Sequence, residues 1–122
     1  MDNKEIGDYG ERLARRYLKL RLYRIIDTNY KTRHGEIDII AKKGRYIVFV
    51  EVKTRKEEHT ESYGRPALAV NYQKRQHIRH GVKSYLVRSN TDLSPRIDII
   101  EVYLREKGHR IEHIKNAFGA VE

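Results

Sequence analysis

Apolar side chains recur along the N-terminal segment at the spacing of one helical face. Arginines and lysines occupy most of the opposite face. This pattern predicts an amphipathic helix from Asn3 to about Leu22, with its basic side toward solvent. The apolar positions are Ile6, Leu13, Ala14, Tyr17 and Leu18.

Three segments rich in β-branched and aromatic residues follow, and each is typical of a strand. They are Tyr23 to Tyr30, Gly35 to Lys42, and Arg45 to Thr54. The third is the most apolar, which predicts a central strand buried on both faces. Lys43-Gly44 predicts a tight hairpin turn between the second strand and the third.

The second half of the chain predicts one more helix and two more strands. A polar loop is expected from Arg55 to Gly64, a helix from Pro66 to Val87, and strands at Arg96 to Arg105 and Arg110 to Ile114. The order α-β-β-β-α-β-β, with the second helix as a crossover, predicts an α/β fold with a mixed sheet of about five strands flanked by helices. With 122 residues, the chain is expected to form one domain, residues 1–122.

Composition removes several classes of site. Cysteine is absent, so disulfides, zinc–thiolate centres and cysteine nucleophiles are excluded. No apolar run reaches the ~18 residues that a membrane-spanning helix needs. The N-terminus lacks the apolar centre of a signal peptide. A cytoplasmic protein without a membrane partner is therefore expected.

The charge balance favours a polyanionic partner. Lysine and arginine number 26 against 17 acidic residues, a formal charge of +9. Such a surplus on a small protein attracts phosphate-rich surfaces. Nucleic acid is the expected partner; an anionic membrane surface is the less favoured alternative, and no membrane partner is predicted.

The strongest chemical signal lies in the second and third predicted strands. Asp38 stands in an apolar strand, and Glu51 and Lys53 stand two apart near the end of the next. Because strand side chains alternate between faces, Glu51 and Lys53 point the same way. Burying them unpaired would be costly, so the pair indicates a site rather than core packing.

Whether Asp38 joins this pair depends on the hairpin turn. A two-residue turn at Lys43-Gly44 sets Asp38 opposite Phe49, on the face of Glu51 and diagonal to it, roughly 7–8 Å away at Cα. A three-residue loop with a bulge reverses the parity and turns Asp38 away. The sequence leaves both registers open.

In the first register, two carboxylates converge on one hard cation. Mg²⁺ or Mn²⁺ suits such oxygen ligands. A nearby lysine can orient an attacking water and offset charge that develops on a phosphate. The alternative is structural: Glu51 and Lys53 form a surface ion pair, and Asp38 caps a backbone group.

The segments GEIDII and FVEVKTR resemble the motifs of the PD-(D/E)xK nucleases. The chain more closely resembles the small archaeal Holliday-junction resolvases, and it is similar to the YraN-like bacterial family over nearly its whole length. The matching parts are an N-terminal helix with Gly10-Glu11, the two motif strands and the helix after them. This resemblance implies a restriction-endonuclease-like fold and hydrolysis of DNA, with branched or junction DNA as a substrate. It also implies a symmetric homodimer by analogy with the resolvases.

The resemblance also implies roles for individual residues. Asp38 and Glu51 would bind Mg²⁺ or Mn²⁺, Lys53 would assist the attacking water, and Glu11 would be an additional helical acid. One departure is Ile37, which precedes the first acid where the motif name has proline.

Two further acids lie close to these motifs. Glu11 borders the apolar stripe of its helix, and the adjacent Gly10 permits a close backbone approach to a neighbour. The alternative for Glu11 is an ordinary solvated acid. Glu36 shares the strand face of Asp38 and is a further candidate ligand, although we expect it to be solvated near the strand start.

Basic and polar side chains near these motifs are expected to contact a phosphate backbone. They are Arg33, His34, Arg55, Gln73, Lys74 and Arg75. The resemblance singles out Gln73 as the helix side chain near the site. His109 and His113, far along the chain, are expected at the surface.

The competing hypothesis is a non-catalytic nucleic-acid-binding protein with a nuclease-like fold. Both hypotheses explain the positive charge. They differ because only the enzyme needs a divalent-ion site.

Overall fold

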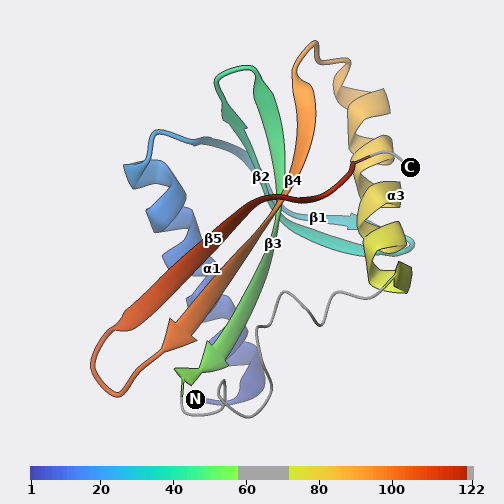
Figure 1. The fold of residues 1–122 in the computed structure, drawn as a ribbon. Helices are drawn as coiled ribbons and strands as arrows, with labels where there is room; N and C mark the ends of the chain where they lie inside the picture. Colours follow the sequence, from blue (N-terminus) through green and yellow to red (C-terminus); the bar gives the residue numbers. More distant parts are fainter. Residues whose placement is uncertain (58–71, 121–122) are drawn as a thin grey trace.

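The structure is a computed structural model that describes residues 1–57 and 72–120 (Figure 1). Its elements are α1 (Asn3–Leu20), β1 (Arg24–Thr32), β2 (Gly35–Lys43), β3 (Tyr46–Lys56), α3 (Tyr72–Ser89), β4 (Ser94–Leu104) and β5 (His109–Phe118). One sheet has the order β1-β2-β3-β4-β5, in which β3 and β4 are parallel and the other pairs antiparallel. The predicted α/β fold with a mixed five-stranded sheet is therefore confirmed.

The two described helices lie on opposite faces of the sheet (Figure 1). Under α1, Leu13 and Leu18 pack with Val48 and Val50 of β3. Under α3, Ile78 and Val82 pack with residues that include Phe49 of the same strand. β3 is the middle strand and is buried on both sides, as its apolar run predicted.

The N-terminal helix begins with a capping box. Asp2 accepts a hydrogen bond from the Glu5 N–H, and Glu5 accepts one from the Asp2 N–H. The helix ends at Leu20, so its predicted end at Leu22 was wrong by two residues. Leu22 instead adopts a left-handed conformation (φ 67°), and Tyr23 N–H donates to the carbonyl of Leu18, as in a Schellman cap.

The hairpin between β2 and β3 turns at Gly44 and Arg45, one residue later than predicted. Gly44 has φ +57°, which a glycine at the first central position of such a turn readily adopts. The turn has two residues, and Lys43 pairs with Tyr46. Asp38 therefore stays on the same strand face as Glu51, as in the first predicted register. The pairing is displaced by two residues, because Lys43 and not Lys42 is the last residue of β2 before the turn.

Other boundaries also differ from the prediction. The segment expected to be a loop from Arg55 begins as strand, because β3 continues to Lys56 beside β4. The rest of that loop after residue 57, and the helix start at Pro66, lie outside the described residues. β5 extends to Phe118 past an irregularity in its pairing with β4.

A buried polar network links β4, β5 and α1. Asp98 is fully buried and accepts hydrogen bonds from Arg96 Nε (2.9 Å) and the Asn116 N–H (3.0 Å). His113 Nε2 lies 2.7 Å from the Asp98 carboxylate, and its Nδ1 lies 3.2 Å from the Tyr17 hydroxyl. The surface position expected for His113 was wrong, since its side chain is 4% exposed. These hydrogen bonds explain how the Asp98 carboxylate is tolerated in the core.

Two glycines set how closely the helices approach the sheet. A Cβ added at Gly10 of α1 would lie 1.8 Å from Thr54 Oγ1, and one at Gly81 of α3 would lie 2.7 Å from Ile37 Cδ1. No larger residue fits either place without movement of the helix or its neighbour. Neither described helix is long and apolar enough to cross a membrane.

Candidate functional site

The site lies where β2 separates from β3. The pairing of these strands ends at Ile39 and Val50, so the next facing pair is Asp38 and Glu51. Asp38 Oδ2 accepts a hydrogen bond of 2.7 Å from the Val52 N–H, a group that would otherwise bond to the ladder. The two-residue turn thus brings Asp38 toward Glu51, and the strand separation opens space between them.

The strand rotates at the same point. Ile39 packs under α1, whereas Ile37 and Ile40 pack under α3. Residues 37 and 39 would share a face in a regular strand. The irregularity around Asp38 re-aims its side chain, so the carboxylate lines a cleft instead of the core.

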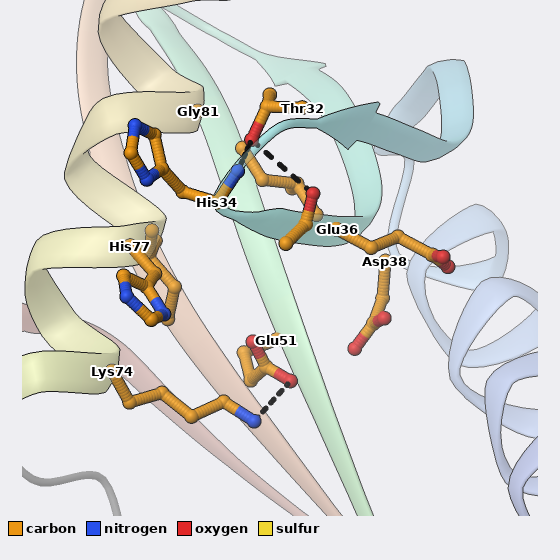
Figure 2. Close-up of a pocket in the computed structure, with 11 residues that line it drawn as sticks. Thr32, His34, Glu36, Asp38, Glu51, Lys74, His77 and Gly81 are labelled. Carbon is orange, nitrogen blue, oxygen red and sulfur yellow. Dashed lines mark hydrogen bonds and ion pairs between the residues drawn. The ribbon is translucent and has the colours of Figure 1, made fainter.

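Glu51 lies close to two lysines, one in this cleft and one beside it. Its carboxylate is buried, and its Oε1 lies 3.8 Å from both Lys53 Nζ and Lys74 Nζ. Lys53 comes from the same strand, and Lys74 comes from the first turns of α3. Figure 2 shows Lys74 reaching across toward Glu51, with Asp38 on the other side. Two acids and two amines therefore gather at the end of the β2–β3 pairing.

The electrostatics of Asp38 are unusual for a carboxyl group. Burial raises its pKa to about 8, and the neighbouring Glu51 carboxylate adds to the effect. The hydrogen bond from the Val52 N–H acts in the opposite direction but is outweighed. Two acids held this close resist carrying charge together in the absence of a cation.

The two lysines differ from each other. Burial and the adjacent Lys74 amine lower the pKa of Lys53. Burial also opposes the charge on Lys74, but contact with Lys53 and the carboxylates of Glu51 and Asp38 outweigh it and raise the pKa of Lys74. The site therefore holds one amine that releases a proton more readily and one that retains it.

A second group of acids adjoins Asp38. One carboxylate oxygen from each of Glu11, Glu36 and Asp38 lies within 4.8 Å of the other two. Burial raises the pKa of Glu11, while a hydrogen bond from Asn29 opposes this. Asn29 Nδ2 lies 3.0 Å from Glu11 Oε1 and 2.5 Å from Glu36 Oε1. The close packing of Gly10 on Thr54 brings Glu11 here.

Asp38, Glu36, Glu51 and Lys74 line a cleft of about 400 Å³ between the sheet and α3, and Glu11 and Lys53 lie beside it (Figure 2). Its described lining includes Asp38, Glu51 and Lys74 together with Glu36 and His77. Its acidic side chains, Glu36, Asp38 and Glu51, offer carboxylate oxygens, and Mg²⁺ and Mn²⁺ prefer oxygen ligands. The donor set therefore fits a hard divalent cation.

The predicted phosphate-contacting residues divide into two groups. Lys74 and His34 line the cleft, and the His34 ring stacks on His77 and His80 of α3, with centroids 6.0 and 4.4 Å away. The others lie elsewhere: Arg33 and Gln73 are exposed, Arg75 is half-buried, and Arg55 lines a separate hollow beside the start of α1 with Lys53.

The structure places Lys74, and not Gln73, in the described lining of the cleft. Asn29 was not singled out from the sequence, and Glu36 was named only as a further candidate ligand. Glu36 was expected to be solvated, and it is exposed, but its carboxylate is held in the acidic group by Asn29. A signal for Asn29 was available, because asparagine is uncommon inside strands.

The family model described as "Uncharacterised protein family UPF0102" matches residues 10–102. The chain belongs to this family. A UPF0102 protein of Alkaliphilus oremlandii is 50% identical over 119 residues, covering 95% of this chain and 99% of the relative. A UPF0102 protein of Clostridioides difficile is 45% identical, covering 97% of this chain and 100% of the relative. These matches confirm the YraN-like family predicted from GEIDII and FVEVKTR.

A solved structure, described as "Crystal structure of SSO0001", is also similar to the chain. It is 18% identical and gives a TM-score of 0.34. The match covers 93% of this chain and 51% of the other, so this chain spans about half of that protein. A TM-score this low carries no argument about function.

Proposed function

We propose that the chain is a metal-dependent endonuclease that hydrolyses DNA phosphodiester bonds. The observation that supports this most is the meeting of Asp38 and Glu51 with Lys53 and Lys74 at the end of the β2–β3 pairing. Carboxylates supply ligands for a hard cation, and amines supply positive charge for a phosphate.

Asp38 and Glu51 would hold Mg²⁺ or Mn²⁺, with Glu11 and Glu36 beside them. When bound, the cation would polarise the phosphodiester and offset charge on it. The raised pKa of Asp38 supports this assignment, because crowded acids that resist ionisation alone are stabilised by a cation.

Lys53 is assigned to the attacking water. Its amine lies beside Glu51, and its lowered pKa suits a group that orients water and exchanges a proton at Nζ. Lys74 is assigned to the phosphate, because its raised pKa keeps the ammonium charged. The phosphate gains negative charge as the bond breaks, and a fixed ammonium stabilises it.

The substrate class proposed is DNA, with branched or junction DNA favoured by the family resemblance. The formal charge of +9 supports a polyanion, and contacts to the backbone would recognise DNA shape more than sequence. A homodimer is part of the proposal, because a junction with two-fold symmetry suits a symmetric enzyme.

The test compares Glu51→Gln and Lys53→Ala with matched exposed variants in the β4–β5 turn, Glu106→Gln and Lys107→Ala. Calorimetry measures Mn²⁺ affinity, and a cleavage assay with Mg²⁺ uses a branched DNA duplex as the substrate. Glu51→Gln should weaken both, because it removes a ligand charge. Lys53→Ala should keep Mn²⁺ binding but slow cleavage by ~10²–10³-fold. Both turn variants should behave as wild type.

Equal cleavage by wild type and both cleft variants would place the activity outside this site or in a contaminant. Wild-type protein that binds branched DNA but cuts none of the substrates would favour a non-catalytic DNA-binding protein.

A further inference from the structure

Asn29 joins two acids that come from different elements. Its single amide nitrogen lies 3.0 Å from Glu11 Oε1 on α1 and 2.5 Å from Glu36 Oε1 on β2. A side-chain amide has two N–H donors, so it can serve both carboxylates at once. Each acid also has an oxygen within 4.8 Å of an oxygen of Asp38.

The backbone explains why this residue is asparagine. Asn29 has φ 52°, the left-handed region, although it lies within β1. It stands between Thr28 and Tyr30, which pair with Ile39 and Ile37, so it faces Asp38 at the irregular point of β2. Glycine, asparagine and aspartate are the residues that adopt this conformation most readily. Glycine would offer no donor and aspartate would repel both acids, so asparagine alone satisfies both demands.

The Asn29 bridge between Glu11 and Glu36 offsets the repulsion between these acids. Like charges at this distance repel, and Glu36 is exposed, so its side chain is otherwise able to move into solvent. The Asn29 amide donates hydrogen bonds that water would otherwise supply to the two carboxylates, and it holds both of them toward Asp38. A carboxylate that is already fixed loses less conformational entropy when it binds a cation than a mobile carboxylate does, so its affinity is higher.

We propose that Asn29 is a positioning residue that holds the Glu11 carboxylate beside Asp38 and so preassembles the acidic side of the cleft for a divalent cation. This inference rests on the proposed function. Asn29 acts through Glu11 and does not itself contact the cation. Residues that orient a metal ligand typically change metal affinity by ~10–100-fold when removed.

Asn29→Gly tests the proposal, because glycine keeps the left-handed backbone and removes only the amide. Asn116→Gly is the matched control: Asn116 has φ 52° as well, and its N–H, which glycine retains, donates to Asp98 in the buried network of β4 and β5 rather than to the acidic group. Glu11→Gln and the double variant Glu11→Gln/Asn29→Gly complete a thermodynamic cycle. Calorimetry with Mn²⁺ measures the dissociation constant of each full-length protein, and thermal unfolding measures its stability.

Asn29→Gly is expected to weaken Mn²⁺ binding about tenfold, while Asn116→Gly leaves it unchanged. In the Glu11→Gln background, loss of the amide should cost little more, because its partner is already altered. Wild-type affinity in Asn29→Gly, or losses that simply add in the double variant, would overturn the inference and leave the proposed function standing. Wild-type protein that binds no Mn²⁺ would overturn the proposed function, and the inference with it.

Discussion

Asp38 accepts a hydrogen bond from the Val52 N–H at the point where β2 leaves β3, with a donor–acceptor distance of 2.7 Å. The carboxylate therefore replaces a backbone partner that the separated strand no longer supplies. This bond fixes one oxygen of Asp38 against the sheet. The same strand separation creates the cleft that Glu51 and Lys74 line.

The raised pKa of Asp38 predicts how stability depends on pH in metal-free buffer. Below about pH 4 the group is protonated in both folded and unfolded chains and costs nothing. As the pH rises toward the folded pKa of about 8, the unfolded chain loses its proton first, so the folded state loses relative stability. Asp38→Asn removes this penalty and keeps an oxygen acceptor for the Val52 N–H.

We expect Asp38→Asn to be more stable than wild type at pH 8 by up to roughly 5 kcal/mol, and therefore to have a clearly higher Tm. The difference should vanish near pH 4. At pH 8, added Mg²⁺ should raise the Tm of wild type but not that of Asp38→Asn. Asp92→Asn, at an exposed position before β4, is the control. An Asp38→Asn variant less stable than wild type at pH 8 would contradict the electrostatic description of the site.

Two glycines of α1 provide a matched pair for the placement of Glu11. A Cβ at Gly10 would lie 1.8 Å from Thr54 Oγ1, whereas a Cβ at Gly7 would have nothing within 4 Å. Gly10→Ala should destabilise the fold by about 1–3 kcal/mol because the helix must move. Gly7→Ala should stabilise it by up to about 1 kcal/mol, since alanine is the better helix former. Denaturant unfolding of both variants measures the contrast, and equal effects would show that α1 does not need its close approach to β3.

Much of this architecture could be predicted from the sequence because its signals are local. The apolar run of β3 identified the central strand, whereas the register of the β2–β3 hairpin stayed open until the structure showed a two-residue turn that keeps Asp38 and Glu51 together. The position of that turn was one residue off, since Lys43-Gly44 and Gly44-Arg45 are both acceptable turns. Because both turns contain two residues, Asp38 and Glu51 lie on the same strand face in either case.

The rest of the site depends on contacts between distant elements. The rotation of α3 is set where Gly81 packs on Ile37, and periodicity alone could not show that this places Lys74 rather than Gln73 over Glu51. The bridging role of Asn29 likewise depends on a left-handed residue within a strand. Such a conformation is decided by tertiary structure.

Lys74 and Gln73 are neighbours in sequence but differ in position, so they test the helix contribution directly. Lys74→Ala should slow cleavage of branched DNA by ~10²-fold, because an ammonium beside Glu51 is lost. Gln73→Ala should leave the rate unchanged, since that side chain is not in the described lining of the cleft. Single-turnover rates at saturating protein separate this effect from binding. A larger loss for Gln73→Ala would show that a different face of α3 meets the substrate.

The positive charge predicts a steep salt dependence of DNA binding. The logarithm of the association constant should fall linearly with the logarithm of salt concentration, with a slope of about −0.9 for each phosphate contacted in duplex DNA. Fluorescence anisotropy in metal-free buffer measures this slope. Binding that does not change between low and physiological salt would contradict a phosphate-contacting surface.

The most direct test of the nuclease proposal is a cleavage panel. Wild-type protein is incubated with linear, flapped, forked and four-way DNA in Mg²⁺, in Mn²⁺ and in EDTA, with Glu51→Gln prepared identically as the background. The proposal predicts cleavage of at least the branched substrates by wild type with either cation, none in EDTA, and a rate for Glu51→Gln lower by ~10²-fold or more. Cleavage that persists in EDTA, cleavage that is equal in Glu51→Gln, or no cleavage of any DNA in the panel would contradict it.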